Sequence, residues 1–190
     1  MRLAAFHSCC LIFVMTVITS CSREKAGTPV TAKDEKSAGQ PDCAELYSEA
    51  RKMDSTLMVQ MDIDPVVGNK AVKAFTDFAY YCQRDSMSAV YLIKTAQVAR
   101  VLNNIPQAKL ALEHCIETYP AFSNRPAAIF LLAQLYDEPT YLNNEAEAKK
   151  LYEKIINEYP NSDWALSSQG AIHFIGRSDE EILKEIKAKK

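Results

Sequence analysis

Glycine is scarce in this chain, and there is no excess of positive charge. Five of the 190 residues are glycine, whereas average usage would give roughly thirteen. Ala, Leu, Glu and Lys are frequent, and all four are good helix formers. The formal net charge of −2 argues against binding to nucleic acid, whose phosphates attract basic surfaces. The composition therefore predicts an all-α protein that does not bind nucleic acid.

The sequence motifs of common enzyme classes are also missing. No Cys-x-x-Cys pair, phosphate-binding glycine loop or nucleophile elbow occurs. The histidines are His7, His114 and His173, and no two of them have a spacing that would let them share a metal ion. We therefore predict a protein that is not an enzyme and that needs neither a metal ion nor a cofactor.

The N-terminus carries a hydrophobic segment that is too short to cross a bilayer. It runs from Leu3 to Ile18, whereas a membrane-spanning helix needs about 20 apolar residues. Such a segment is typical of a secretory signal peptide. It ends in Ile18-Thr19-Ser20-Cys21, an aliphatic residue and two small ones before a cysteine. This ending resembles the lipobox of bacterial lipoproteins.

The lipobox resemblance implies processing and a membrane anchor. Residues 1–20 would be removed as the signal peptide, and the thiol of Cys21 would receive a diacylglyceryl group. Two or more acyl chains hold a protein stably, because each buried CH₂ contributes about 0.8 kcal/mol. No Asp follows Cys21, which favours the outer membrane, with the protein facing the periplasm. The alternative is an ordinary signal peptide that is cut near Cys21 by coincidence.

Residues 21–42 are predicted to comprise the lipidated cysteine and a flexible tether. Residues 22–41 include no aromatic side chain and mix Gly, Pro, Ser and charged residues, as unstructured linkers do. A flexible coil of that length spans about 25 Å root mean square. The folded domain is expected to cover residues 43–190.

Three cysteines follow Cys21, and two of them are predicted to form a disulfide. Cys43 begins the first expected helix, and Cys82 ends the second. In an antiparallel hairpin these two ends lie side by side, and an exported protein meets an oxidising compartment. Two separately buried thiols are the alternative. Cys115 falls on an apolar helix face and is expected in the core.

Two segments of the chain match each other without gaps. AKLALEHCIETYP covers residues 108–120, and AKKLYEKIINEYP covers residues 148–160. Each begins with Ala and ends with Tyr-Pro, and a helical pattern with a central Ala precedes each of them. This arrangement resembles the tetratricopeptide repeat, in which two helices form each unit of about 34 residues.

The tetratricopeptide resemblance implies a fold. Small residues recur where neighbouring helices must approach closely, namely at Ala96, Ala108, Ala133, Ala148 and Gly170. The bulky residues between them would be buried only when each helix pair stacks on the next. We therefore expect an all-α protein, a short right-handed α-solenoid of tetratricopeptide-like helix pairs with a C-terminal capping helix. That last helix should start at a capping box formed by Ser178 and Glu181.

The second unit is longer than the usual repeat. Its Tyr159-Pro160 pair lies 40 residues after Tyr119-Pro120, rather than about 34. Half of this extra length lies between Ala133 and Ala148. The loop around residues 138–141 is therefore expected to be long, and it is a candidate contact for a partner.

In tetratricopeptide folds the first helices line a concave surface that binds peptides or extended segments of other proteins. By register, the resemblance assigns this surface to Ile93, Gln97, Arg100, Ala127, Phe130, Gln134, Trp164, Ser167 and Ala171. Glutamine side chains can hydrogen-bond an extended backbone, and aromatic side chains can anchor a partner. The alternative for Phe130 and Trp164 is simple packing in the core.

The predicted function follows from the anchor and the repeats together. We expect a membrane-anchored protein–protein interaction scaffold of the bacterial cell envelope. Its partner would be another envelope protein or an extended peptide segment, bound on the concave surface. The alternative is an accessory ligand-binding or glycan-binding lipoprotein of an uptake system.

Overall fold

The computed structural model describes residues 41–59 and 62–188. These residues belong to one compact unit, Gly39–Lys190. The predicted signal peptide, the lipidated Cys21 and almost all of the predicted tether lie outside the described residues. None of the described helices is both long and apolar enough to cross a membrane.

All regular secondary structure in the described part of the chain is helical, which confirms the predicted fold class. The helices are α1 (Cys43–Met58), α2 (Pro65–Tyr81), α3 (Met87–Val101), α4 (Ile105–Thr118), α5 (Arg125–Asp137), α6 (Glu145–Glu158), α7 (Asp163–Phe174) and α8 (Asp179–Ala188).

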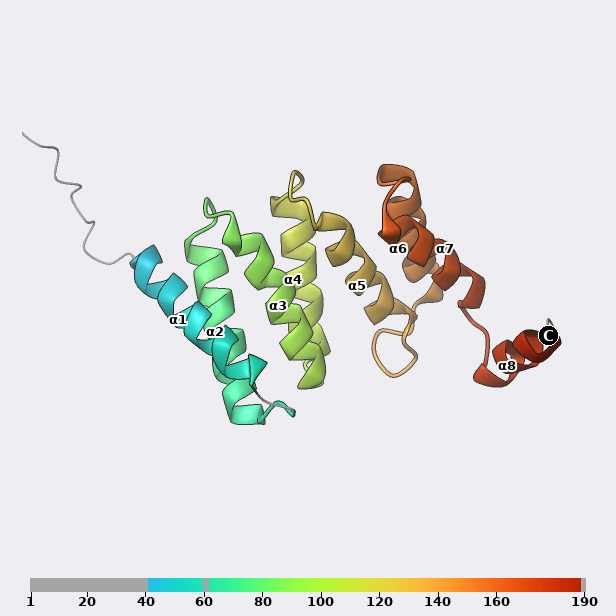
Figure 1. Ribbon diagram of the computed structural model, residues 1–190, viewed down its shortest axis with the longest axis horizontal. Helices are drawn as coiled ribbons and strands as arrows, with labels where there is room; N and C mark the ends of the chain where they lie inside the picture. The colour runs from blue at the N-terminus through green and yellow to red at the C-terminus, as the bar shows by residue number, and fades with distance from the viewer. Residues whose placement is uncertain (1–40, 60–61, 189–190) are drawn as a thin grey trace, which may run out of the picture. The chain divides into compact units, whose positions relative to one another are not determined.

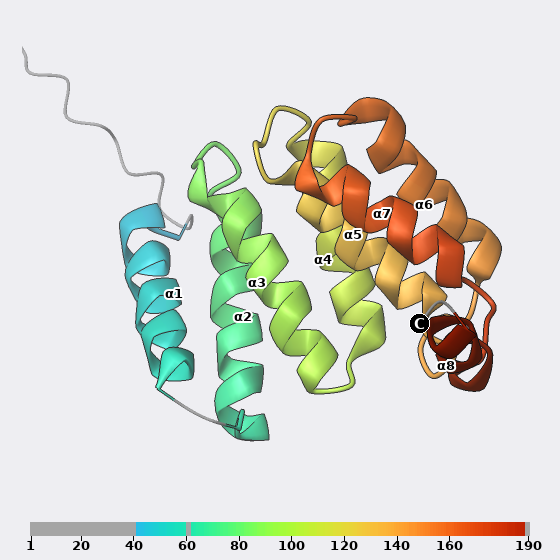
Figure 2. The ribbon, with the colours of Figure 1, turned by 45° about the vertical axis from the view of Figure 1, so that its right-hand side comes forward.

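The helices pack in the order in which they follow one another along the chain (Figure 1). From α1 to α7, each helix packs against the next, and α5 also touches α7. In Figure 2, α3 and α7 lie toward the viewer, whereas α4 and α6 lie behind them. The described residues therefore form a serial stack of helix pairs, as in a tetratricopeptide-like solenoid, in which each pair is completed by its neighbours.

Polar side chains begin several of these helices. The Asp64 carboxylate accepts hydrogen bonds from the backbone N–H groups of Val66 and Val67 at 2.9 and 3.0 Å. Pro65 follows as the first helical residue of α2, where its missing N–H is not needed. Asn104 and Asn144 cap α4 and α6 in the same way. These caps fix where each helix starts and thus the register of the stack.

Alanine occupies the close contacts between helices. Ala108, Ala133 and Ala148 have no exposed surface, and Ala96 is 3% exposed. Because their side chains are single methyl groups, the helices can approach closely at these positions. The prediction that small residues set the helix spacing is confirmed at these four alanines.

Gly170 does not make the close contact that the sequence predicts for it. A methyl group added at Gly170 would meet no other atom within 4 Å. The physical reason is that no second helix packs on this side of α7. After Gly176, whose φ is +71°, the chain turns away, and Figures 1 and 2 both show α8 turned from α7 rather than lying along it.

The last helix is held mainly by polar contacts near its junction with α7. The predicted capping box is present, because the Ser178 N–H donates to the Glu181 carboxylate at 2.9 Å and the Glu181 N–H donates to Ser178 Oγ at 3.3 Å. Glu185 forms an ion pair with Arg177 at 2.6 Å. The apolar side chains Leu183 and Ile186 stay about half exposed.

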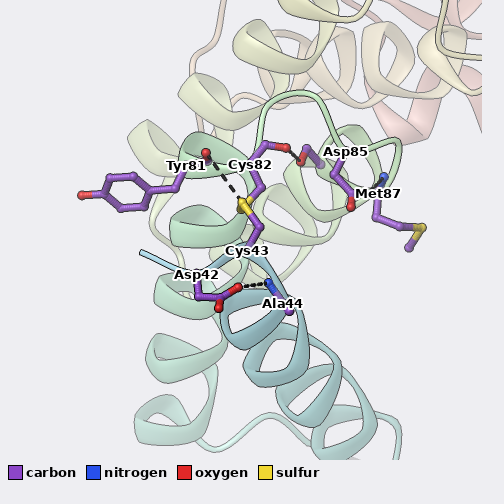
Figure 3. The surroundings of a disulfide bond; sticks show 8 residues. Asp42, Cys43, Ala44, Tyr81, Cys82, Asp85 and Met87 are labelled. Atoms are coloured by element: carbon purple, nitrogen blue, oxygen red, sulfur yellow. Dashed lines mark hydrogen bonds between the residues drawn. A yellow bond between two sulfur atoms is a disulfide. The ribbon is translucent and has the colours of Figure 1, made fainter. Parts of the chain in front are cut away.

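A disulfide joins Cys43 to Cys82, the pair that the sequence predicts. Their Cα atoms are 5.7 Å apart. Figure 3 shows the bond linking the start of α1 to the residue that follows α2. Close by, Asp42 accepts a hydrogen bond from the Ala44 N–H at 2.9 Å and caps α1. Cys115 is free and fully buried in the core.

Arg125 fixes the start of α5 against two other helices. Its Nε donates to the carbonyl oxygen of Ile116 at 3.0 Å. Its Nη1 donates to the Glu158 carboxylate at 2.8 Å and to the Tyr159 hydroxyl at 2.9 Å. The hydrogen bond to Tyr159 gives the tyrosine of the second Tyr-Pro motif a structural role, because it helps to align α5 with the end of α6.

Candidate partner-binding groove

A groove of about 590 Å³ opens beside the C-terminal halves of α5 and α7. Arg100 from α3 and Gln134 from α5 line it, and so do residues of the loop between α5 and α6. Phe174 from α7 and the segment between α7 and α8 complete it. Pockets that bind small molecules have comparable volumes, so the groove is large enough for a small ligand or for a side chain and adjoining backbone of another protein.

Aromatic side chains form one wall of the groove. Phe130 and Tyr152 both line it, and their ring centroids are 5.3 Å apart. Phe130 also contacts Trp164, again at 5.3 Å. Tyr152 is 1% exposed, whereas Phe130 is half-buried. This chain of three rings links α5, α6 and α7, so the aromatic wall is held by the helix packing itself.

Carboxylates gather on the side of the groove that the α5–α6 loop forms. Asp137 ends α5, Glu138 follows it, and Glu145 begins α6. Burial raises the pKa of Asp137 above its ordinary value, and the negative charges of Glu145 and Glu138 raise it further. The hydroxyl of Tyr152 donates a hydrogen bond to Asp137, which lowers the pKa of Asp137 and opposes those two effects. The groove thus holds negative charges that repel one another.

The α5–α6 loop is tied to α5 by its backbone. The N–H groups of Leu142 and Asn144 donate to the carbonyl oxygens of Leu135 and Tyr136 at 3.1 and 2.7 Å. Asn143 has a φ of 46°, a left-handed conformation that Asn adopts more readily than most residues. These bonds give the extra residues of this repeat a fixed path, and the loop forms a firm edge of the groove.

Two arginines lie at the edges of the groove and differ in their surroundings. Arg177 is paired with Glu185 at 2.6 Å, and its guanidinium lies 5.8 Å from the ring centroid of Phe174. Arg100 is exposed on α3 and forms no ion pair within residues 41–59 and 62–188. The charge of Arg177 is therefore compensated within the domain, whereas that of Arg100 is available to a ligand.

The structure brings some of the sequence-predicted binding residues together. Arg100, Phe130, Gln134 and Ala171 all line the groove. Gln97 is exposed and lies along two smaller neighbouring crevices, one of which it shares with Arg100.

Other predicted binding residues lie away from the groove lining. Trp164 reaches the groove only through its contact with Phe130. Ser167 is exposed, and its hydroxyl donates to the carbonyl oxygen of Asp163 at 2.9 Å.

Ile93 and Ala127 do not offer their side chains to a partner. Ile93 is 8% exposed and Ala127 is 4% exposed. Ile93 packs in the hydrophobic cluster to which α3, α4 and α5 contribute most of the buried residues. At this position of α3 its side chain points between helices rather than away from them. Ile93 was predicted on the partner-binding surface, and the structure places its side chain in the core instead.

Apart from Arg100, the sequence did not single out the charged residues of the groove. Asp137, Glu145 and Arg177 lie near the ends of helices or between them, where the repeat register carries no information. The one available signal was the long loop around residues 138–141, which was a candidate partner contact. Glu138 and Tyr141 of that loop line the groove.

Neither the groove nor the rest of the described chain holds a metal-binding arrangement. Within those residues, no three His, Cys, Asp or Glu side chains are placed to hold one ion. The groove carboxylates share a space without converging on a point.

Comparison with known families identifies one repeat. Residues 127–162 match the tetratricopeptide repeat family. The matched segment covers nearly all of α5, the long loop and all of α6, and these elements supply most of the groove. No curated protein and no solved structure matches the chain. Tetratricopeptide repeats generally bind other proteins, and the repeat in this chain lies within a larger stack of helices.

Proposed function

We propose that this protein is a scaffold of the bacterial cell envelope that binds another protein in the groove beside α5 and α7. The observation that carries the proposal is that groove, because the matched repeat of residues 127–162 supplies most of its lining. A wall of aromatic rings and several polar groups at its edges suit the recognition of an extended protein segment.

The partner would lie along the odd-numbered helices. Exposed Gln97 and Arg100 on α3, and Gln134 on α5, can donate hydrogen bonds to the backbone carbonyl groups of an extended segment. Phe130 would supply an aromatic anchor within the groove, supported from behind by Trp164. Ser167 would contact the partner at the α7 end of the same surface.

The proposal includes a lipid anchor on Cys21. It is supported by the lipobox-like residues Ile18 to Cys21 and by the apolar segment before them. A tether of residues 21–42 would let the repeat domain search a small volume near the membrane. The absence of Asp after Cys21 supports an outer-membrane location with the domain facing the periplasm.

Photo-crosslinking in the producing bacterium tests the binding function. A photoreactive p-benzoylphenylalanine is placed at Gln97 or Gln134, and at Glu153, an exposed residue of α6, as the control. We expect covalent adducts with a defined envelope protein from Gln97 or Gln134 but not from Glu153. If all three positions gave the same adducts, or none gave any, the proposed binding surface would be wrong.

Mass spectrometry of the purified protein tests the anchor. The mature N-terminal peptide should begin at Cys21 and carry the mass of attached acyl chains. The variant Cys21→Ala should lose that modification and leave the membrane fraction. An unmodified N-terminus at any other residue would refute the anchor without affecting the binding test.

A further inference from the structure

We infer that the groove takes a basic side chain, lysine or arginine, from an extended segment of the partner protein. The inference rests on the proposed function, because it names the chemistry of the partner that the scaffold binds. The groove volume of about 590 Å³ exceeds what one such side chain fills, which leaves room for the adjoining backbone.

The groove carboxylates lack positive partners within the domain. Asp137, Glu138 and Glu145 form no ion pair with any Lys or Arg of the described chain. Carboxylates on the outer face behave differently, because Glu153 pairs with Lys149 at 4.0 Å. The three carboxylates of the groove thus lie together without a neutralising cation from the domain.

The positive groups already in the groove do not satisfy these carboxylates. Arg177 is bound to Glu185 at 2.6 Å, so it adds little net charge. Arg100 comes from α3, whereas the carboxylates come from α5, the loop and α6. Near the loop the groove is consequently negative, and charge complementarity selects a cation as the occupant of that part.

The aromatic wall selects an organic cation with a long apolar stem. Half-buried Phe130 lies against the space that the carboxylates border, and exposed Phe174 borders it from α7, whereas Tyr152 is buried behind Phe130. The methylene groups of lysine or arginine can cover such rings while the charged end remains near the carboxylates, and a cation above an aromatic face is itself attracted to it. A metal ion does not suit the site, because the described carboxylates do not converge on one point.

Peptide binding to the purified full-length protein tests this inference. The probes are four short fluorescent peptides that differ only at a central residue, which is lysine, arginine, norleucine or glutamate. Binding is measured by fluorescence anisotropy at low and high salt. We expect the lysine and arginine peptides to bind at least about tenfold more tightly than the norleucine peptide, and we expect this preference to shrink as salt screens the charges.

Paired variants place the effect in the groove. Asp137→Asn with Glu145→Gln removes two groove charges, and Glu117→Gln with Glu153→Gln removes two charges from exposed positions of α4 and α6. The first pair should lower the affinity for the lysine peptide about tenfold, and the second should leave it unchanged within twofold. The single variant Glu138→Gln, at an exposed position, should lower it in the same direction even if the double variant folds poorly.

The possible outcomes separate this inference from the proposed function. Equal affinity for the lysine and norleucine peptides, or a lysine preference that survives loss of the groove charges, would overturn the inference. In both cases an adduct from the photoreactive residue at Gln134 would show that a protein still binds at the groove. Absence of every adduct would instead remove the proposed function, whatever the peptides do.

Discussion

Breaking the disulfide should lower the stability of the domain by a predictable amount. Cys43 and Cys82 are 39 residues apart in sequence, and a cross-link that closes a loop of that length stabilises the folded state by about 4 kcal/mol in the chain-entropy model. The variant Cys43→Ser isolates this effect, because Cys43 is exposed and the buried Cys82 keeps its own side chain. For a domain of this size, each kcal/mol corresponds to about 2 to 4 °C, so Tm should fall by roughly 8 to 16 °C.

Thermal unfolding followed by circular dichroism, with and without a reductant, measures this change. The reductant should bring the natural protein to the Tm of Cys43→Ser and should leave the variant unchanged. Ser48→Ala, another exposed position on α1, serves as the control and should change Tm by less than 2 °C. A fall of less than about 3 °C on loss of the cross-link would refute the entropic reasoning.

Four further results are expected. Gly170→Ala should raise the free energy of unfolding, measured in urea, by about 0.5 to 1 kcal/mol, because the added methyl group meets open space. Ala133→Leu should lower the free energy of unfolding by about 1 to 3 kcal/mol, because Ala133 has no exposed surface. A change of the opposite sign in either variant would contradict the packing assigned to that residue. Burial raises the pKa of Cys115 to about 12, so a thiol reagent at pH 8 should label this residue only after the protein is unfolded, and rapid labelling of the native protein would disprove its burial. Because the pKa of Asp137 is raised, its carboxyl group holds a proton more tightly in the folded chain than in the unfolded chain, and ionised Asp137 destabilises the fold as the pH rises through that raised pKa. Asp137→Asn should therefore have a higher Tm than the natural protein at pH 7, and the difference in Tm should disappear as the pH falls below about 3.8. A difference in Tm that stayed the same at low pH would show that ionisation of Asp137 is not its cause.

The sequence predicted the stacking because the relevant signals are local. Ala133 and Ala148 recur at the places in their helices that Ala96 and Ala108 occupy one repeat earlier, and a small side chain between two helices has the same consequence wherever it occurs. The Cys43–Cys82 pair was predictable because a helical hairpin brings the start of one helix beside the end of the next. Both the stacking and the disulfide could be predicted from the fact that neighbouring helices run in opposite directions.

Gly170 and the groove charges depend on features that no local pattern contains. The open side of Gly170 results from the direction that the chain takes after Gly176. Asp137 and Glu145 share a groove because hydrogen bonds fold the long loop back on α5. The repeat pattern was enough to assign Phe130 and Gln134 to the binding surface, because both lie within a helix. Residues at helix ends are placed by the adjoining turns, and the repeat pattern does not specify the geometry of those turns.

Serial packing has a consequence for how this protein can vary. From α1 to α7, no described helix packs extensively against one more than two places away along the chain, so Cys43 on α1 and Glu145 on α6 share no neighbours. Substitutions at such separated positions contribute independently to the free energy of unfolding. Substitutions can therefore change which ligand the groove prefers without any compensating substitution near the disulfide at the other end of the stack.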